Sequence, residues 1–188
     1  MTRKNELAPV YGTVNDLLFR PEPITAIVGR GRTGKTHLAA RLYSAHLVIG
    51  IYDATILFDP YSQIDSDAGF KGTEEFLDAL EQIAAENGSK PEAERKKILA
   101  IMDEADLIYD AWRRKGDFKE YLLRYNRHMN VDLVLTFRNI PKKDILLYAN
   151  KVVLFQHYNK ELDAFMEQQG CKLNPRDFPP RFFKIINL

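Results

Sequence analysis

Residues 29–36 match the phosphate-binding pattern G-x-x-x-x-G-K-[ST] in full. The eight residues are Gly29, Arg30, Gly31, Arg32, Thr33, Gly34, Lys35 and Thr36. Glycines in such a loop let backbone N–H groups turn inward around phosphates, the Lys35 ammonium can reach the terminal phosphates, and the Thr36 hydroxyl is placed for Mg²⁺. The pattern predicts a site for a nucleoside triphosphate; the alternative is a glycine turn that only connects a strand to a helix.

A pair of adjacent acids follows an apolar run at residues 98–102. Asp103 is expected to hold Mg²⁺ through a water molecule, and Glu104 is expected to orient and polarise the water that attacks the γ-phosphate. The pair therefore favours hydrolysis of the nucleotide over binding alone. Acids also stabilise the start of a helix through its dipole, so a purely structural acid pair is the alternative interpretation.

The segments around these two motifs must bring them together. A β-branched run at 24–28 leads into the glycine loop, and a helical pattern begins at 37, which is the strand–loop–helix context that the phosphate-binding pattern requires. Elsewhere the apolar patterns predict strands at 54–58, 98–102, 131–136, 152–155 and 181–186, and helices around 73–87, 118–125 and 162–166.

Strands that alternate with helices predict an α/β fold, with a mainly parallel sheet and helices on both faces. Ligands of such sheets lie at the carboxyl ends of the strands. The phosphate loop, the acid pair and the Thr136 end of the strand at 131–136 all emerge at that edge. We therefore expect these three segments to share one site.

The length of 188 residues fits a single domain, with a core at 21–188 and an extension at 1–20. This excludes a two-domain helicase, although residues 103–106 spell DEAD. A GTPase is disfavoured because 159–162, NKEL, lacks the aspartate that reads guanine, and a nucleotide kinase usually lacks a glutamate beside the metal-binding aspartate. Apolar runs reach five residues, against the roughly 20 of a membrane span, and the start has no secretion signal.

Positive charge is concentrated in one part of the chain. Residues 111–143 hold nine Lys or Arg against three acids, although the net charge of the whole chain is only +1. Such a segment can face phosphates and indicates a nucleic-acid partner; a solvated helix face with exposed loops is the alternative. Cys171 is the only cysteine and the four histidines lack metal-ligand spacing, so neither a disulfide nor a zinc site is predicted.

The segment 125–138, YNRHMNVDLVLTFR, resembles the FtsK-HerA superfamily of DNA-pumping ATPases. In that family a helix with an arginine leads into an apolar strand that ends in threonine or serine, usually followed by glutamine and arginine. By this resemblance Arg127 takes the place of the arginine finger, and Thr136 lies at the end of the sensor strand. Phe137 stands where the family usually has glutamine, so Thr136 or Arg138 is expected to replace that contact with the γ-phosphate.

The resemblance covers about residues 24–186 and implies a RecA-like (ASCE) P-loop ATPase that uses ATP and Mg²⁺. The short chain is most similar to the genome-packaging ATPases of membrane-containing icosahedral viruses, which implies a double-stranded DNA translocase in the virion or the host cytoplasm. It further implies a homo-oligomeric ring, expected to be a hexamer, in which Arg127 reaches the ATP of a neighbouring subunit; Arg124 and Arg138 are rival candidates. Expected partners are DNA, bound without sequence specificity, and a capsid or portal/membrane protein.

Two other functions stay open. A cellular or plasmid DNA-pumping ATPase of the HerA or conjugation type would use the same residues, and only the neighbouring genes separate it from a packaging motor. A nucleotide-binding assembly switch without sustained turnover belongs to a different class. Rapid hydrolysis stimulated by linear duplex DNA would eliminate the switch.

Overall fold

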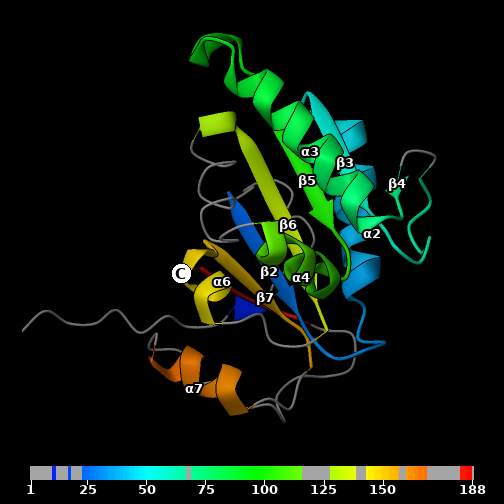
Figure 1. Ribbon diagram of the computed structural model, residues 1–188. Helices are drawn as coiled ribbons and strands as arrows, with labels where there is room; N and C mark the ends of the chain where they lie inside the picture. The colour runs from blue at the N-terminus through cyan, green and yellow to red at the C-terminus, as the bar shows by residue number, and fades with distance from the viewer. Residues whose placement is uncertain are drawn as a thin grey trace, which may run out of the picture.

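One sheet of eight strands runs through the middle of the molecule (Figure 1). In the computed structural model, the described residues are 10–11, 17, 23–66, 69–115, 128–138, 143–156, 160–168 and 183–187. The strands are β1 (Val10–Tyr11), β2 (Ile24–Val28), β3 (Ala54–Phe58), β4 (Gly69–Phe70), β5 (Ile98–Met102), β6 (Val131–Phe137), β7 (Lys151–Leu154) and β8 (Lys184–Asn187). Their order across the sheet is β1-β8-β7-β2-β6-β5-β3-β4.

The central strands are parallel and buried. β2 lies between β6 and β7, and β6 separates β2 from β5, which in turn pairs with β3. β8 runs antiparallel to β7, and β1 runs antiparallel to β8. Every residue of β2, β5 and β6 is buried. Burial on both faces explains why these segments are near-continuous apolar runs instead of alternating ones.

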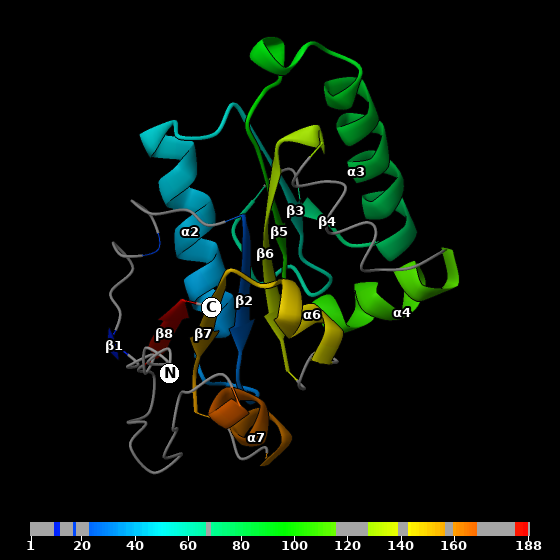
Figure 2. The ribbon, with the colours of Figure 1, turned by 90° about the vertical axis from the view of Figure 1, so that its left-hand side faces the viewer.

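Helices cover both faces of the sheet (Figure 2). The described helices are α2 (Lys35–Ile49), α3 (Thr73–Gly88), α4 (Ala105–Lys115), α6 (Lys143–Tyr148), α7 (Lys160–Gln168) and the short 3₁₀ turn η1 (Glu92–Glu94). The apolar side chains of α2 join a core on one face, whereas α3, α4, α6 and α7 contribute to a second core on the other face. This arrangement confirms the predicted α/β fold with a mainly parallel sheet.

α3 illustrates how the sequence places a helix on the sheet. Its first turn carries Glu74 and Glu75, whose charges favour the helix start because they complement the helix dipole. Phe76, Leu77 and Leu80 lie at helical spacing and are fully buried against the strands. Each such side chain contributes about 2 kcal/mol through burial of apolar surface. The helix is therefore held mainly by packing of one face.

Most predicted strand bounds agree with the structure. β2, β3 and β5 have the predicted bounds, β6 extends one residue further, and β7 begins and ends one residue earlier. Val10–Tyr11, within the extension predicted at 1–20, pairs with β8, so this part of the extension joins the sheet. The predicted helix at 118–125 and the residues Arg124, Arg127 and Cys171 lie outside the described residues. Within the described ranges, no helix combines the length and apolar content needed to cross a membrane.

Candidate nucleotide-binding site

The glycine loop leaves the carboxyl end of β2 and leads directly into α2. The Gly29 N–H donates to the carbonyl of Phe137 at 3.3 Å, and the Arg30 N–H donates to the carbonyl of Gln156 at 3.2 Å. These bonds tie the loop to the ends of the strands on either side of β2. The loop is thus anchored before any ligand binds.

Two glycines of the loop are required by its conformation. Gly34 has φ 109°, in the left-handed region that glycine adopts without strain. A Cβ atom at Gly29 would lie 2.6 Å from the Cβ of Phe155 and 3.0 Å from the Thr33 hydroxyl, so a larger residue would push the loop away from β7. The pattern glycines therefore serve the shape of the loop directly.

The Lys35 side chain folds back over its own loop. Its ammonium donates to the carbonyl of Arg30 at 2.9 Å, and the Thr33 hydroxyl donates to the same carbonyl at 2.8 Å. Burial lowers the pKa of Lys35 below its ordinary value of 10.5, and the nearby Glu104 and Asp103 carboxylates oppose that shift. A buried ammonium that donates to a neutral carbonyl can exchange it for a charged phosphate oxygen, so Lys35 is well suited to meet a triphosphate.

The Asp103 carboxylate accepts a hydrogen bond on each oxygen. The Thr36 hydroxyl donates to Oδ2 at 2.9 Å, and the Thr136 hydroxyl donates to Oδ1 at 2.6 Å. The phosphate loop and the acid pair, predicted separately, are thereby joined directly, and Thr136 of β6 holds the other oxygen of Asp103. Asp103 is fully buried, so its orientation is fixed by these contacts.

The oxygens of Thr36 and Asp103 fit a Mg²⁺ ion. Magnesium takes one or two protein oxygens and completes its shell with phosphate oxygens and water. Within the described residues, no group of three or more His, Cys, Asp or Glu side chains converges to hold a metal alone. The donor set therefore suits a metal that arrives with a nucleotide.

Glu104 is held from two directions. Its backbone, at a left-handed φ of 57°, donates its N–H to the Thr136 hydroxyl at 3.0 Å. Its carboxylate Oε2 lies 2.7 Å from Nε of Arg138, and the Glu104 side chain is 8% exposed against 49% for Arg138. Hydrogen bonding to this carboxylate raises the pKa of the Arg138 guanidinium. The expected base thus has a cation of the same chain at one oxygen.

Arg138 is itself positioned by residues that sequence reasoning missed. Its backbone N–H donates to Oδ2 of Asp106 at 2.8 Å, and its guanidinium lies 5.5 Å from the centre of the Tyr61 ring. Asp106 is in the first turn of α4, where an acid signals a helix start and nothing more. No local pattern relates residue 61 to residue 138.

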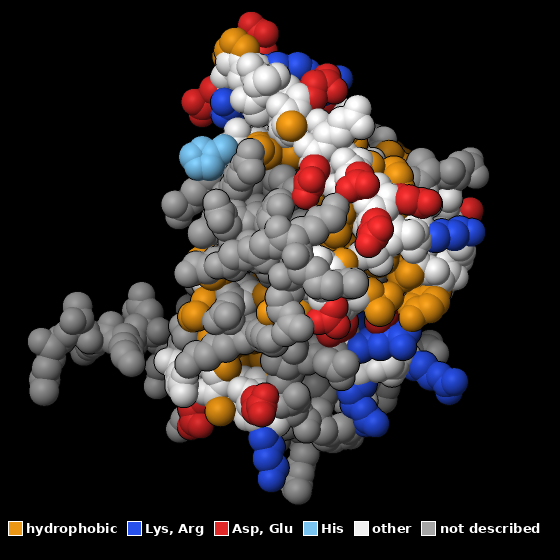
Figure 3. All heavy atoms as spheres, in the orientation of Figure 1, with side chains coloured by type: hydrophobic (Ala, Val, Ile, Leu, Met, Phe, Trp, Pro, Cys, Tyr) orange, Lys and Arg blue, Asp and Glu red, His pale blue; other side chains and the backbone are white. Residues whose placement is uncertain are grey.

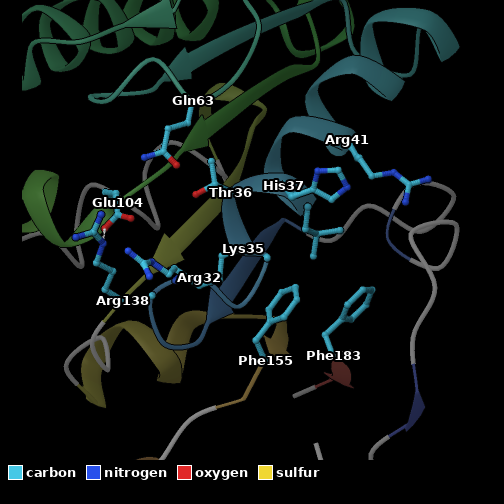
Figure 4. A pocket seen from close by; sticks show the side chains of 13 residues that line it. Arg32, Lys35, Thr36, His37, Arg41, Gln63, Glu104, Arg138, Phe155 and Phe183 are labelled. Carbon is cyan, nitrogen blue, oxygen red and sulfur yellow. Dashed lines mark ion pairs between the residues drawn. The ribbon is translucent and has the colours of Figure 1, made fainter. Parts of the chain in front are cut away.

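A pocket of about 940 Å³ opens over these groups (Figure 4). Its lining residues are Gly31, Arg32, Gly34, Lys35, Thr36, His37, Leu38, Arg41, Gln63, Glu104, Arg138, Phe155 and Phe183. Figure 3 shows Lys and Arg side chains gathered where the loop between β2 and α2 lies in Figure 1, below the acidic side chains over α3. Arg32, Lys35, Arg41 and Arg138 are among the lining residues, so the pocket is suited to anions.

Most of the predicted site residues meet at this pocket. The structure brings together the loop residues and four residues from the ends of β5 and β6: Asp103, Glu104, Thr136 and Arg138. The chemical roles assigned to them stay predictions. Arg127 lies outside the described residues. Sequence reasoning did not find the pocket residues Phe155 and Phe183, since they follow or precede apolar strands without any chemical motif.

Comparison of the sequence with protein-family models and with curated proteins gives no match. Solved structures do resemble the fold. B204, the DNA-packaging ATPase from Sulfolobus turreted icosahedral virus, matches with a TM-score of 0.57 and 16% identity, covering 79% of this chain and 82% of that chain. The genome-packaging NTPase B204 from Sulfolobus turreted icosahedral virus 2, in complex with AMPPCP, matches with a TM-score of 0.59 and 14% identity, over 89% and 93% of the two chains.

A third likeness is to the cytoplasmic domain of the Thermomonospora curvata type VII secretion ATPase EccC. Its TM-score is 0.57 at 12% identity, covering 88% of this chain and 25% of that chain. These neighbours confirm the predicted RecA-like fold of P-loop ATPases, and the two B204 proteins are packaging enzymes of the kind that the resemblance indicated. At such low identity the likeness concerns the fold, and the function must be argued from the site.

Proposed function

We propose that this protein is an ATPase that moves double-stranded DNA, of the kind that packages viral genomes. The observation that carries the proposal is the chain of hydrogen bonds from Thr36 through Asp103 and Thr136 to Glu104. This chain unites the phosphate loop with the acid pair beside a pocket large enough for a nucleotide. Two motifs that could each be structural turns make one connected site.

The residues divide the chemistry among them. Backbone N–H groups of the loop and the Lys35 ammonium bind the phosphates, and Lys35 exchanges the Arg30 carbonyl for a phosphate oxygen. Thr36 and, through a water molecule, Asp103 would hold a Mg²⁺ ion, which would supply positive charge beside the β- and γ-phosphates. Glu104 accepts a hydrogen bond from the attacking water and orients it in line with the γ-phosphate.

Arg138 belongs to the same subunit's site, because its guanidinium already contacts Glu104. That contact favours a role for Arg138 beside its own catalytic glutamate over a role as a finger reaching the neighbouring subunit. Arg127 is therefore the proposed finger, supplied by the adjacent subunit of a ring, with Arg124 as the remaining alternative. A finger of this kind contributes about 10³ to 10⁵ in rate and makes hydrolysis depend on assembly.

Double-stranded DNA is the proposed substrate that the ATPase translocates. The basic segment 111–143 would face the DNA backbone, so binding would be independent of base sequence and would weaken as salt rises. A hexameric ring, a capsid or portal/membrane protein as its partner, and a place in the virion or the host cytoplasm follow from the same proposal. The packaging neighbours of the fold support it.

Steady-state phosphate release by the wild type and Glu104→Gln, measured across protein and duplex DNA concentrations, tests the proposal. Glu104→Gln should bind ATP normally and hydrolyse it about 10²- to 10³-fold more slowly, since an amide cannot accept the proton. Wild-type turnover should rise with both protein and DNA concentration. Equal rates for the two proteins would overturn the mechanism, and slow turnover without DNA stimulation would favour a nucleotide-dependent assembly switch.

Arg127→Ala tests the subunit dependence separately. This variant should bind ATP yet fail to accelerate when DNA or more protein is added, because the finger acts only across the assembled interface. Mixing it with Glu104→Gln should restore part of the activity, since each variant supplies what the other lacks. Full activity of Arg127→Ala alone would move the finger to Arg124.

A further inference from the structure

The pocket has two chemically different ends (Figure 4). Glu104, Arg138 and Gln63 lie at one end, beside Thr36. At the other end the side chains of Phe155 and Phe183 lie next to each other, with Lys35 between the two ends. A nucleoside triphosphate has the same division, because a polyanionic chain is joined to a flat aromatic base.

The fold brings the two phenylalanines together across antiparallel strands. Leu154 at the end of β7 is paired with Lys184 at the start of β8, so the residues that flank this pair, 155 and 183, emerge side by side. Their ring centres lie 5.4 Å apart with planes inclined at 46°. Phe155 is buried, whereas Phe183 is only half-buried and still lines the pocket. Part of the Phe183 ring therefore remains available to a ligand.

The aromatic end is fixed to the phosphate loop. A Cβ atom placed on Gly34 would lie 3.4 Å from the Phe155 ring, and one on Gly29 would collide with the Phe155 Cβ. Phe155 thus supports both the loop and the ring of Phe183. Any group that contacts Phe183 is held at a set distance from the phosphates.

The first turns of α2 form a second wall of the aromatic end. His37 and Arg41 lie one helical turn apart, are both exposed, and line the pocket together with Leu38. His37 and Arg41 carry hydrogen-bond donors, and they lie on the side of the pocket where the phenylalanines are (Figure 4). This end therefore offers an aromatic face and donors at one edge.

We infer that the aromatic end is the nucleobase subsite, in which Phe183 stacks on the base, and that it takes purine nucleoside triphosphates with little distinction between adenine and guanine. The inference rests on the proposed function of the site. Among the described residues at this end, no carboxylate or carboxamide side chain is present to read the exocyclic groups that separate the two purines. Donors on His37 and Arg41 suit N7, which both purines carry, and every base has a face for stacking.

Binding of four probes to the wild type and to Phe183 variants, with Mg²⁺ and measured calorimetrically, tests the inference. The probes are ATP, GTP, CTP and inorganic tripolyphosphate. The wild type should bind ATP and GTP within about three-fold of each other and CTP about ten-fold more weakly, because a pyrimidine stacks over less area and lacks N7. Phe183→Ala should bind ATP and GTP about ten-fold more weakly and tripolyphosphate with unchanged affinity.

Three further variants keep the test independent of folding. Phe183→Trp should retain or improve purine binding, since it enlarges the stacking face. Phe183→Leu keeps apolar packing against Phe155 without an aromatic face, so it should lose purine affinity while its melting temperature stays near that of the wild type. Val48→Ala is the matched control, because Val48 is 86% exposed near the far end of α2; it should change nothing.

Each contrary result has its own meaning. Unchanged ATP affinity in Phe183→Ala, or an equal loss of tripolyphosphate and ATP, would overturn the base subsite while the proposed function stood. A wild-type preference of 50-fold or more between ATP and GTP would overturn the shared recognition of purines. Failure of the wild type to bind any of the triphosphates would overturn the proposed function and this inference with it.

Discussion

Two clusters of polar side chains, each built around a buried acid, lie at opposite ends of the parallel strands, and one of them borders the pocket. The carboxyl-edge cluster consists of Thr36, Asp103, Glu104, Thr136 and Arg138. The amino-edge cluster consists of His46, Tyr52, Lys97 and Asp132. β6 contributes to both, since Asp132 and Thr136 lie near its two ends.

The amino-edge cluster is held by contacts among its own side chains. The Tyr52 hydroxyl donates to Oδ2 of Asp132 at 2.9 Å, and the Lys97 ammonium lies 3.6 Å from the same oxygen and 4.9 Å from the centre of the Tyr52 ring. The His46 ring meets Tyr52 edge-on at 4.8 Å. Burial raises the pKa of Asp132 and of Tyr52. The Tyr52, Lys97 and Asp132 side chains thus satisfy one another and serve the fold, whereas Nδ1 of His46 is buried with no hydrogen-bond partner within the described residues.

The carboxyl-edge cluster uses similar residue types differently. Threonine hydroxyls hold Asp103, while Lys35 and Glu104 line a pocket of about 940 Å³. The difference teaches how to interpret a buried acid. A catalytic or binding role is indicated when the charged groups near the acid face an open pocket, and a role in stability is indicated when they face each other. Substitutions in the two clusters should therefore separate function from folding, and the following five are ordered from the largest expected effect.

Lys35→Met should abolish nucleotide binding without harming the fold. Loss of the ammonium removes a charge-assisted bond to the phosphates and should weaken ATP binding about 100-fold or more. The free energy of unfolding should stay equal or rise, because burial disfavours the Lys35 charge, as its lowered pKa shows, and methionine carries no charge. Calorimetric ATP titration and thermal melting measure both. An ATP affinity equal to that of the wild type would contradict the proposal that Lys35 binds the phosphates.

Thr136→Val should damage function and stability together. The change leaves Oδ1 of Asp103 and the N–H of Glu104 without the hydroxyl that serves both, at a cost of about 2 kcal/mol in unfolding free energy. It should also lower the turnover number about 30-fold, because both acids lose their orientation. Thr136→Ser keeps the hydroxyl and is the matched control. Equal turnover of the valine and serine variants would refute the bridging role.

Arg138→Ala should reduce turnover about ten-fold with a smaller effect on ATP affinity. The variant leaves the 8%-exposed Glu104 carboxylate without its cation. Arg138→Lys should recover only part of the rate, because an ammonium cannot bond Glu104 and lie over Tyr61 with a planar fork. Single-turnover hydrolysis measures the effect. A faster variant would instead mean that Arg138 restrains Glu104.

Tyr52→Phe should lower stability and leave catalysis alone. Loss of the hydroxyl removes one hydrogen bond from Asp132, worth about 1 kcal/mol of unfolding free energy, while Lys97 still balances the charge. Chemical denaturation measures the loss, and the ATPase rate should match the wild type. A large fall in that rate would show that the amino-edge cluster is coupled to the site.

His46→Phe should change how stability depends on pH. Burial, helped by Lys97, lowers the pKa of His46, so the unfolded chain binds more protons than the folded chain as the pH falls through about 6.5. The wild type should therefore lose about 1 kcal/mol more than the variant between pH 7 and pH 5. Asp132 shifts in the opposite sense in both proteins, so it cancels in the difference. If the unfolding free energies of the two proteins changed equally with pH, His46 would not have the lowered pKa from which this prediction starts.

Much of the fold and part of the site were predictable from local sequence. The loop at residues 29–36 is contiguous, so one short segment contains all the residues that predict phosphate binding. β5 is apolar along its whole length and lies between Lys97 and Asp103, and β2 is a β-branched, mostly apolar run between Pro23 and Gly29, so the local sequence indicates the bounds of both strands. The ion pair between Glu104 and Arg138 was not predictable, because it depends on β5 lying beside β6 in a particular register.

The sequence by itself determined which chemical groups are present and which short segments become strands, helices and turns, because those choices depend on neighbouring residues. Only the tertiary structure decided which groups meet. The order of the strands brings Thr36 into contact with Asp103, 67 residues later in the chain. The antiparallel pairing of β8 with β7 places Phe183 beside Phe155. Contacts between distant segments follow from strand order and register, which local patterns do not specify.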